Sequence, residues 1–252
     1  MRKWPILITR PEPAARSLAF DLEQQGYKTW VFPTLEISAA PDQSALRQYI
    51  ESLAQQNWAV FTSQHAVYYA LSLLADYYPR WPKKVKVAAI GSTTNEVLTA
   101  NNIPVEVVPL SFTSEALLAC AEWQDIQDQK FLLFSGLGGR TLLETTLTTR
   151  GAKVHKVITY QRHCPQVDST PLKQALLTKQ LTAIISTSVE SLENLLKLLG
   201  DKFQEYLRDI PLIVISERMQ QTAIDLGITA PLYVAENATH TALLTKIKEV
   251  FT

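Results

Sequence analysis

Small polar residues follow short apolar runs at four places, and these turns are the first candidates for chemistry. The four turns are Thr62-Ser63-Gln64, Gly91-Ser92-Thr93-Thr94, Ser135-Gly136-Leu137-Gly138-Gly139-Arg140 and Ser186-Thr187-Ser188. Where a strand ends and a helix begins, free backbone N–H groups and a hydroxyl can bind a carboxylate or a phosphate. Ser and Thr are also ordinary N-caps, so each turn has a purely structural alternative.

The glycine-rich turn resembles a nucleotide-binding sequence only in part. Gly136-x-Gly138-Gly139 is similar to the start of a dinucleotide fingerprint, but Thr141 stands where Gly or Ala is needed, and no Lys-Ser/Thr pair follows as in a P-loop. Its glycines still let a backbone approach an anion closely, and Arg140 would add a positive charge. A nucleotide-dependent transferase is therefore a weakly supported alternative.

Two further side chains have a functional and a structural interpretation. Arg10 follows the first apolar run and precedes Pro11, so it is expected near a strand end, where it either contacts a ligand or pairs with a neighbouring helix. His65 follows Thr62-Ser63 at the start of a predicted helix, where it is either a base or a surface group. The sequence alone indicates no Ser/His/Asp arrangement.

Composition excludes several classes of protein. The 252 residues are 46% hydrophobic and carry 24 Lys and Arg against 24 Asp and Glu, so we expect neither a nucleic-acid nor a membrane partner. No apolar run is long enough for a membrane span or a signal peptide, which predicts a cytoplasmic protein. Two distant cysteines and four scattered histidines give no zinc spacing, so we expect no metal site.

The elements that must position these turns are alternating strands and helices. Short β-branched runs such as 6–8, 59–61, 105–108, 131–134 and 212–215 predict about ten strands, and apolar residues at helical spacing lie between most of them. This alternation is typical of an α/β protein with two mostly parallel sheets. Ligands of such sheets bind beyond the carboxyl ends of the strands.

The two halves of the chain are weakly similar to each other. At an offset of 125 residues, Phe61-Thr62-Ser63 falls on Ser186-Thr187-Ser188, Ile90-Gly91 on Ile215-Ser216, and Gly26 on Gly151. Duplication of an α/β unit explains a shared offset over separate segments. The alternative is that any two α/β units share strand-turn-helix spacing.

Several motifs of the chain, taken in their order along the sequence, resemble those of the uroporphyrinogen-III synthase family of tetrapyrrole (porphyrin and haem) biosynthesis. They are Ile6-Leu7-Ile8-Thr9-Arg10-Pro11, Phe32-Pro33-Thr34-Leu35-Glu36-Ile37, Phe61-Thr62-Ser63-Gln64-His65-Ala66-Val67, Ala89-Ile90-Gly91-Ser92-Thr93-Thr94, Gly138-Gly139-Arg140, Arg150-Gly151-Ala152 and Tyr160-Gln161-Arg162. The resemblance implies two flavodoxin-like parallel-sheet domains joined by a two-stranded connector. Residues 1–34 with 165–252 would form one domain, 40–156 the other, and 35–39 with 157–164 the connector.

The resemblance also implies the reaction and its residues. A member of the family is a cofactor-independent hydro-lyase that closes hydroxymethylbilane, a linear tetrapyrrole rich in carboxylates, to uroporphyrinogen III in the inter-domain cleft, with inversion of ring D and loss of water. Tyr160 matches a connector tyrosine and is the candidate general acid. The resemblance implies that Thr62, Ser63, Thr94, Thr187 and Ser188 bind substrate carboxylates. The turns themselves add Arg10, Gly91, Ser92, Ser135, Gly136, Gly138, Arg140 and Ser216 to the expected substrate-binding residues.

One turn departs from the family's pattern. After Ile215, some members have Gly-x-Thr-Thr, whereas this chain has Ser216-Glu217-Arg218-Met219, so Met219 takes the place of a hydroxyl. Ser216 or backbone N–H groups are the expected substitutes. We expect a monomer, and a non-catalytic two-domain receptor for a small anion is the alternative from a different class.

Overall fold

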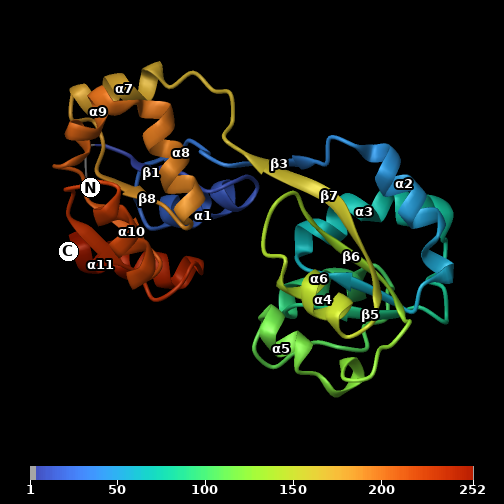
Figure 1. Cartoon of the computed structure of the whole chain (residues 1–252). Helices are drawn as coiled ribbons and strands as arrows, with labels where there is room; N and C mark the ends of the chain where they lie inside the picture. Colours follow the sequence, from blue (N-terminus) through green and yellow to red (C-terminus); the bar gives the residue numbers. More distant parts are fainter. Residues whose placement is uncertain (1–3, 252) are drawn as a thin grey trace. The chain divides into compact units, whose positions relative to one another are not determined.

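The computed structural model describes residues 4–251 and contains two five-stranded sheets (Figure 1). Contacts divide the chain into unit 1, Met1–Glu36 with His163–Thr252, and unit 2, Ile37–Arg162. Each unit has one sheet with helices on both faces, which confirms the predicted α/β class. Residues 1–3 and 252, which the predicted first domain includes, lie outside the described residues.

Unit 1 has a flavodoxin-like strand order. Its strands are β1 (Ile6–Ile8), β2 (Thr29–Val31), β8 (Ala183–Ile185), β9 (Leu212–Val214) and β10 (Leu232–Val234). They lie side by side in the order β10-β9-β8-β1-β2, and neighbouring strands are parallel. Read from β2, this is the 2-1-3-4-5 order of doubly wound sheets. The central strands β1, β8 and β9 are fully buried, as apolar strands covered on both faces must be.

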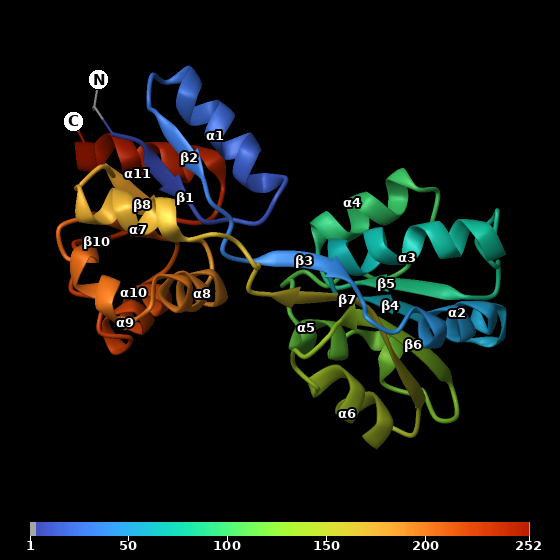
Figure 2. The ribbon, with the colours of Figure 1, turned by 90° about the horizontal axis from the view of Figure 1, so that it is seen from above.

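The helices of unit 1 cover the two faces of its sheet (Figure 2). On one face, α1 (Ala14–Gln24) and α11 (His240–Phe251) pack against the sheet through Leu18, Leu22 and Leu243. On the other face lie α7 (Thr170–Leu177), α8 (Val189–Leu199) and α10 (Glu217–Asp225), and the short α9 (Asp201–Gln204) follows α8 in the chain. Because apolar side chains recur on one side of each helix, burial of that side stabilises the layers.

Unit 2 has the order β3-β7-β6-β4-β5. Its strands are β3 (Glu36–Ala39), β4 (Trp58–Phe61), β5 (Lys86–Ala89), β6 (Lys130–Gly136) and β7 (Lys153–His163). The pairs β5–β4, β4–β6 and β6–β7 are parallel. The segments expected as connector strands, β3 and the end of β7, belong to this sheet, and their role as a connector stays a prediction.

The predicted strand over Val105–Val108 is wrong in extent. It forms only an isolated parallel bridge between Val107 and Ala88. Pro104 and Pro109 flank the segment, and because proline has no N–H to donate, the ladder cannot extend beyond them.

Alternate residues of the strands in unit 2 face opposite layers. Ala59 and Phe61 pack towards α2 (Gln43–Glu51), α3 (Gln64–Tyr77) and α4 (Ser92–Ala100). Trp58 and Val60 pack towards α5 (Ser114–Leu118) and α6 (Leu142–Thr149), where the Trp58 ring meets Trp123 and Phe131. This alternation follows from the two-residue period of a strand.

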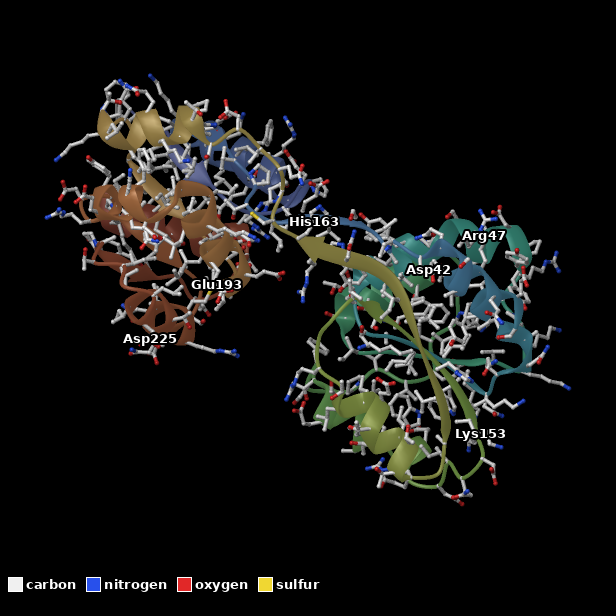
Figure 3. The ribbon with its side chains drawn as sticks, turned by 45° about the horizontal axis from the view of Figure 1, so that its top comes forward. Asp42, Arg47, Lys153, His163, Glu193 and Asp225 are labelled. Carbon is white, nitrogen blue, oxygen red and sulfur yellow. The ribbon has the colours of Figure 1, made fainter. Side chains whose placement is uncertain are left out.

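The start of α2 shows how polar residues fix a helix end in this chain. Asp42 stands just before α2, which carries Arg47 (Figure 3), and its carboxylate accepts from the backbone N–H groups of Ser44 and Ala45. The Ser44 hydroxyl and these N–H groups hold the pKa of Asp42 below its usual value. Within residues 4–251, no helix is long and apolar enough to cross a bilayer.

Candidate functional site

The turn after β4 supplies Thr62 and Ser63. The Thr62 N–H and hydroxyl both donate to the carbonyl of Phe134 on β6, at 3.1 and 3.2 Å, so this side chain stabilises the sheet edge. The Ser63 hydroxyl accepts from the Ala66 N–H at 3.1 Å and therefore caps α3. The capping interpretation of Ser63 is thus confirmed, and it leaves the hydroxyl proton of Ser63 free for another acceptor.

That acceptor is Tyr160 on β7. The Ser63 hydroxyl donates to the Tyr160 hydroxyl oxygen at 3.1 Å, and the Leu137 N–H donates to the Tyr160 carbonyl at 2.7 Å. The Tyr160 side chain is 7% exposed and its ring centre lies 5.7 Å from that of His65 and 6.1 Å from that of Tyr69. The Tyr160 ring is therefore held in place, and its hydroxyl is hydrogen-bonded to the turn after β4.

Gly136 is required by this placement of Tyr160. A Cβ atom at Gly136 would lie 2.6 Å from Cζ and 2.8 Å from Cε2 of the Tyr160 ring, closer than side-chain atoms approach each other. Gly138 and Gly139 have positive φ angles of 76° and 83°, and open space surrounds their Cα atoms. Glycine is thus required in this turn for two different reasons. At Gly136 the Tyr160 ring leaves no room for a side chain, and at Gly138 and Gly139 the backbone adopts a positive φ angle.

Ser135 and Arg140 flank these glycines. The Ser135 hydroxyl is buried and has no hydrogen-bond partner in the described part of the chain. Arg140, expected to add charge to an anion site, instead pairs with Glu115 at 2.7 Å, and both side chains are exposed. An exposed pair of this kind contributes little stability, so little free energy is lost when it breaks.

The turn after β5 contains three of the predicted residues. Gly91 precedes α4 with extended backbone, and Ser92 begins the helix. Thr94 is buried in the first turn of α4. A Cβ at Gly91 would lie 3.2 Å from the Cβ of Phe112, so the ring of an exposed loop residue covers this helix start.

The corresponding turns of unit 1 place four predicted residues at strand ends. Ser188 caps α8 by accepting from Ser191, and Ser216 caps α10 by accepting from Met219, at 3.0 and 3.2 Å. Thr187, in the turn before Ser188, is half-buried. Arg10 follows β1 and is partly buried, and its guanidinium donates to the Ala238 carbonyl at 3.2 Å. Burial lowers the Arg10 pKa, yet guanidinium stays protonated in proteins.

Met219 has a packing role. Its side chain is buried in the core between the sheet of unit 1 and helices α8 and α10, whereas its backbone N–H binds Ser216. A hydroxyl at this position would face the same core. The sequence pattern identified the replaced residue but did not show that its side chain points inward.

Sequence reasoning missed two exposed apolar side chains at these turns. Phe112 and Leu137 are 58% and 53% exposed. Phe112 lies against Gly91, and Leu137 belongs to the turn that pairs with Tyr160. Large apolar residues within polar turn segments were the available signal, because exposed apolar side chains that cluster near a site often mark a ligand-binding surface.

His65 is the titratable neighbour of Tyr160. Burial, and secondly the positive charge of Arg162, lower the pKa of His65 below its usual value. The unfolded chain therefore takes up a proton near pH ~6.5 that the folded chain resists, so the free energy of unfolding falls as pH drops below this value. We expect His65→Gln to remove this part of the pH dependence. Between about pH 7 and pH 5, the free energy of unfolding of the wild type should therefore fall more than that of the variant.

Urea unfolding of both proteins at several pH values measures this difference. His155→Gln is the control, because His155 is exposed on β7 and packs against Tyr49. A stability difference between wild type and His65→Gln that does not change with pH would contradict the assigned environment of His65.

Comparisons with known proteins agree with one another. A sequence model of the family described as "Uroporphyrinogen-III synthase HemD" matches residues 16–245. The chain is 35% identical to the uroporphyrinogen-III synthase of Salmonella typhimurium and 34% identical to that of Escherichia coli, in both cases over 95% of this chain and 98% of the relative. Its fold is similar to a crystal structure of mutant uroporphyrinogen III synthase from Thermus thermophilus, with TM-score 0.66, 16% identity and 98% of each chain covered.

Proposed function

The chain belongs to the uroporphyrinogen-III synthase family, and on this premise we propose that its strand-end turns hold hydroxymethylbilane while it closes to uroporphyrinogen III. The reaction inverts ring D and releases water, and we propose that it needs no cofactor. Departure of the substrate hydroxyl leaves an azafulvene cation, which the substituted carbon of the last ring attacks to form a spiro intermediate. This intermediate fragments and closes again as the inverted isomer.

Carboxylate binding is supported by the helix starts at these turns. Helices α3 and α4 begin just after strands of the unit 2 sheet, and α8 and α10 begin just after strands of the unit 1 sheet. In each unit, the first N–H groups of these helices therefore lie at the carboxyl edge of that unit's sheet. The partial positive charge of a helix start favours a carboxylate there. A chain with no net charge can hold a polyanion in this way, and Arg10 and Arg140 are the cations that we assign to the same turns.

The observation that carries the proposed chemistry is the contact between Ser63 and Tyr160. Because the Ser63 hydroxyl accepts from Ala66 and donates to Tyr160, the Tyr160 phenol keeps its own proton for a further acceptor. We assign that acceptor as the departing hydroxyl of the substrate. A hydrogen bond from a weak acid at this point stabilises the leaving group in the transition state.

The exposed apolar residues Phe112 and Leu137 are proposed to contact pyrrole rings. The free bilane can close without an enzyme to the uninverted isomer, so the protein must fix the fold of the chain as well as its carboxylates. Apolar side chains beside the turns that bind the substrate carboxylates would contact the pyrrole rings that carry those carboxylates.

The double variant Phe112→Ser/Leu137→Ser is expected to raise KM and to lower kcat/KM by about tenfold, because two apolar contacts with the rings are lost. Initial rates of uroporphyrinogen III formation at varied substrate concentration measure the change. Leu177→Ser is the matched control, since Leu177 is an exposed leucine at the end of α7 in unit 1. Equal effects of the control and the double variant would contradict the assignment.

The test of the proposed function is to supply freshly generated hydroxymethylbilane to the purified protein without additives. The products are oxidised and separated by chromatography into isomers I and III. Isomer III in excess over isomer I supports the proposal. Isomer I alone, at the rate seen without protein, would overturn it and favour a binding protein for small anions.

A further inference from the structure

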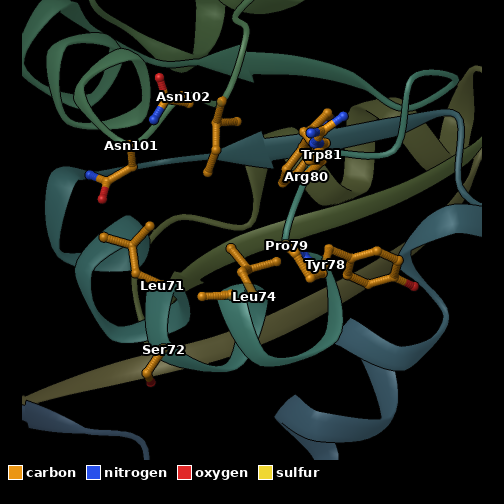
Figure 4. Close-up of a pocket in the computed structure, with 11 residues that line it drawn as sticks. Leu71, Ser72, Leu74, Tyr78, Pro79, Arg80, Trp81, Asn101 and Asn102 are labelled. Atoms are coloured by element: carbon orange, nitrogen blue, oxygen red, sulfur yellow. The ribbon is translucent and has the colours of Figure 1, made fainter.

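A cavity of about 440 Å³ lies in unit 2 away from the turns described above. It is formed by the last turns of α3, the segment Tyr78–Trp81 and the residues that follow α4 (Figure 4). Helices α3 and α4 begin at the carboxyl ends of β4 and β5, and the chain returns along them to the amino end of β5. The cavity therefore lies at the opposite edge of the sheet from Tyr160.

The walls of the cavity are mainly apolar and are held by hydrogen bonds. Leu71 and Leu74 of α3 line it on one side and the Trp81 ring on another, and Ile103 is also among the lining residues. The Trp81 indole N–H donates to the Val85 carbonyl at 2.7 Å, just before β5. This bond fixes the orientation of the ring in the cavity wall.

Arg80 gives the cavity its charge. Its side chain is exposed on the lining, and no hydrogen bond or ion pair joins it to another residue of 4–251. No Asp or Glu is among the lining residues, and the segment 80–86 adds Lys83, Lys84 and Lys86 without an acidic residue. Ser72, Tyr78, Asn101 and Asn102 add neutral polar side chains to the lining.

We propose that this cavity is a second ligand site, which takes a small carboxylate with an apolar body. The apolar body would lie against Leu71, Leu74 and Trp81, and the carboxylate would bind the Arg80 guanidinium. The volume and the mainly apolar lining with one charged group are typical of small-molecule sites. A planar guanidinium matches a carboxylate in geometry as well as in charge. This site does not depend on the proposed function.

The probe for the test is 4-phenylbutyrate, with the neutral 4-phenylbutyramide for comparison. Titrations are followed by calorimetry and by the NMR signal of the Trp81 indole N–H. We expect one site with Kd on the order of 1 mM for an anion of this size, and weaker binding of the amide. Arg80→Gln should weaken binding of the carboxylate about fivefold. Lys84→Gln, which removes a nearby charge outside the lining, should change it by less than about twofold.

Several results would overturn the proposal. They are absence of saturable binding up to about 10 mM, equal affinity for carboxylate and amide, and equal losses in Arg80→Gln and Lys84→Gln. Sedimentation at several protein concentrations adds an independent check. Self-association that Arg80→Gln abolishes would assign the cavity to a second copy of the chain and would also overturn the proposal.

Discussion

Replacing Tyr160 by phenylalanine is expected to lower kcat by about tenfold or more while the protein remains folded. The ring stays in place because its burial and its contacts with Tyr69 and His65 do not need the hydroxyl. Only the group that receives the Ser63 hydrogen bond is removed. The measurement is the rate of uroporphyrinogen III formation at saturating substrate, with circular dichroism to verify the fold.

Two further variants separate chemistry from structure. Tyr69→Phe makes the same change on the neighbouring ring, whose hydroxyl donates to the Ile37 carbonyl at 2.6 Å, and it should retain kcat. Ser63→Ala removes the donor to Tyr160 together with the α3 cap, so it should lower the free energy of unfolding by about 1 kcal/mol and also slow turnover. Unchanged turnover in Tyr160→Phe would remove Tyr160 from the mechanism.

The fold was largely predictable because its signals are local. The central strands β1, β4 and β8 are continuous apolar runs, which is typical of strands covered on both faces. The segment Val105–Val108, expected as a strand, forms only one bridge, and the apolar residues between the flanking prolines gave no sign of this. Composition and periodicity indicate which segments are strands, but they do not show where a ladder stops.

The candidate site was predictable as a set of turns but not as a set of contacts. Ser63, Ser188 and Ser216 were found because a polar residue after an apolar run marks a helix start. The partner of Ser63, Tyr160, comes from a distant part of the chain, and such a partner follows from strand register. The same holds for Arg140, whose pairing with Glu115 depends on how α5 and α6 pack.

The contact between Gly136 and Tyr160 is the clearest case of information that only the assembled sheet contains. The register between β6 and β7 shifts between Ser135 and Gly136, so that Gly136 faces Tyr160. A one-residue change of register would give the ring a different neighbour. The sequence predicted both residues as functional, for separate reasons, and gave no indication that each depends on the other.

Gly136→Ala should therefore destabilise the protein by roughly 1–3 kcal/mol and should also lower kcat, because the added methyl displaces the Tyr160 ring from Ser63. Its Cβ would lie 2.6 Å from Cζ of that ring, and β6 is held between β4 and β7, so the strand cannot simply move away. Urea unfolding and the isomer assay measure the two losses separately.

The matched control is Gly138→Ala, two residues along the same turn. A Cβ at Gly138 meets no atom within 4 Å, so its only cost is the positive φ angle of 76°, about 1 kcal/mol, with Tyr160 undisturbed. A double-mutant cycle of Gly136→Ala with Tyr160→Leu then tests the cause. Because the smaller side chain leaves room for the methyl, the second substitution should cost less in the Gly136→Ala background than in wild type. Additive losses of stability would show that the alanine acts elsewhere, and the dependence of Tyr160 on Gly136 would have to be abandoned.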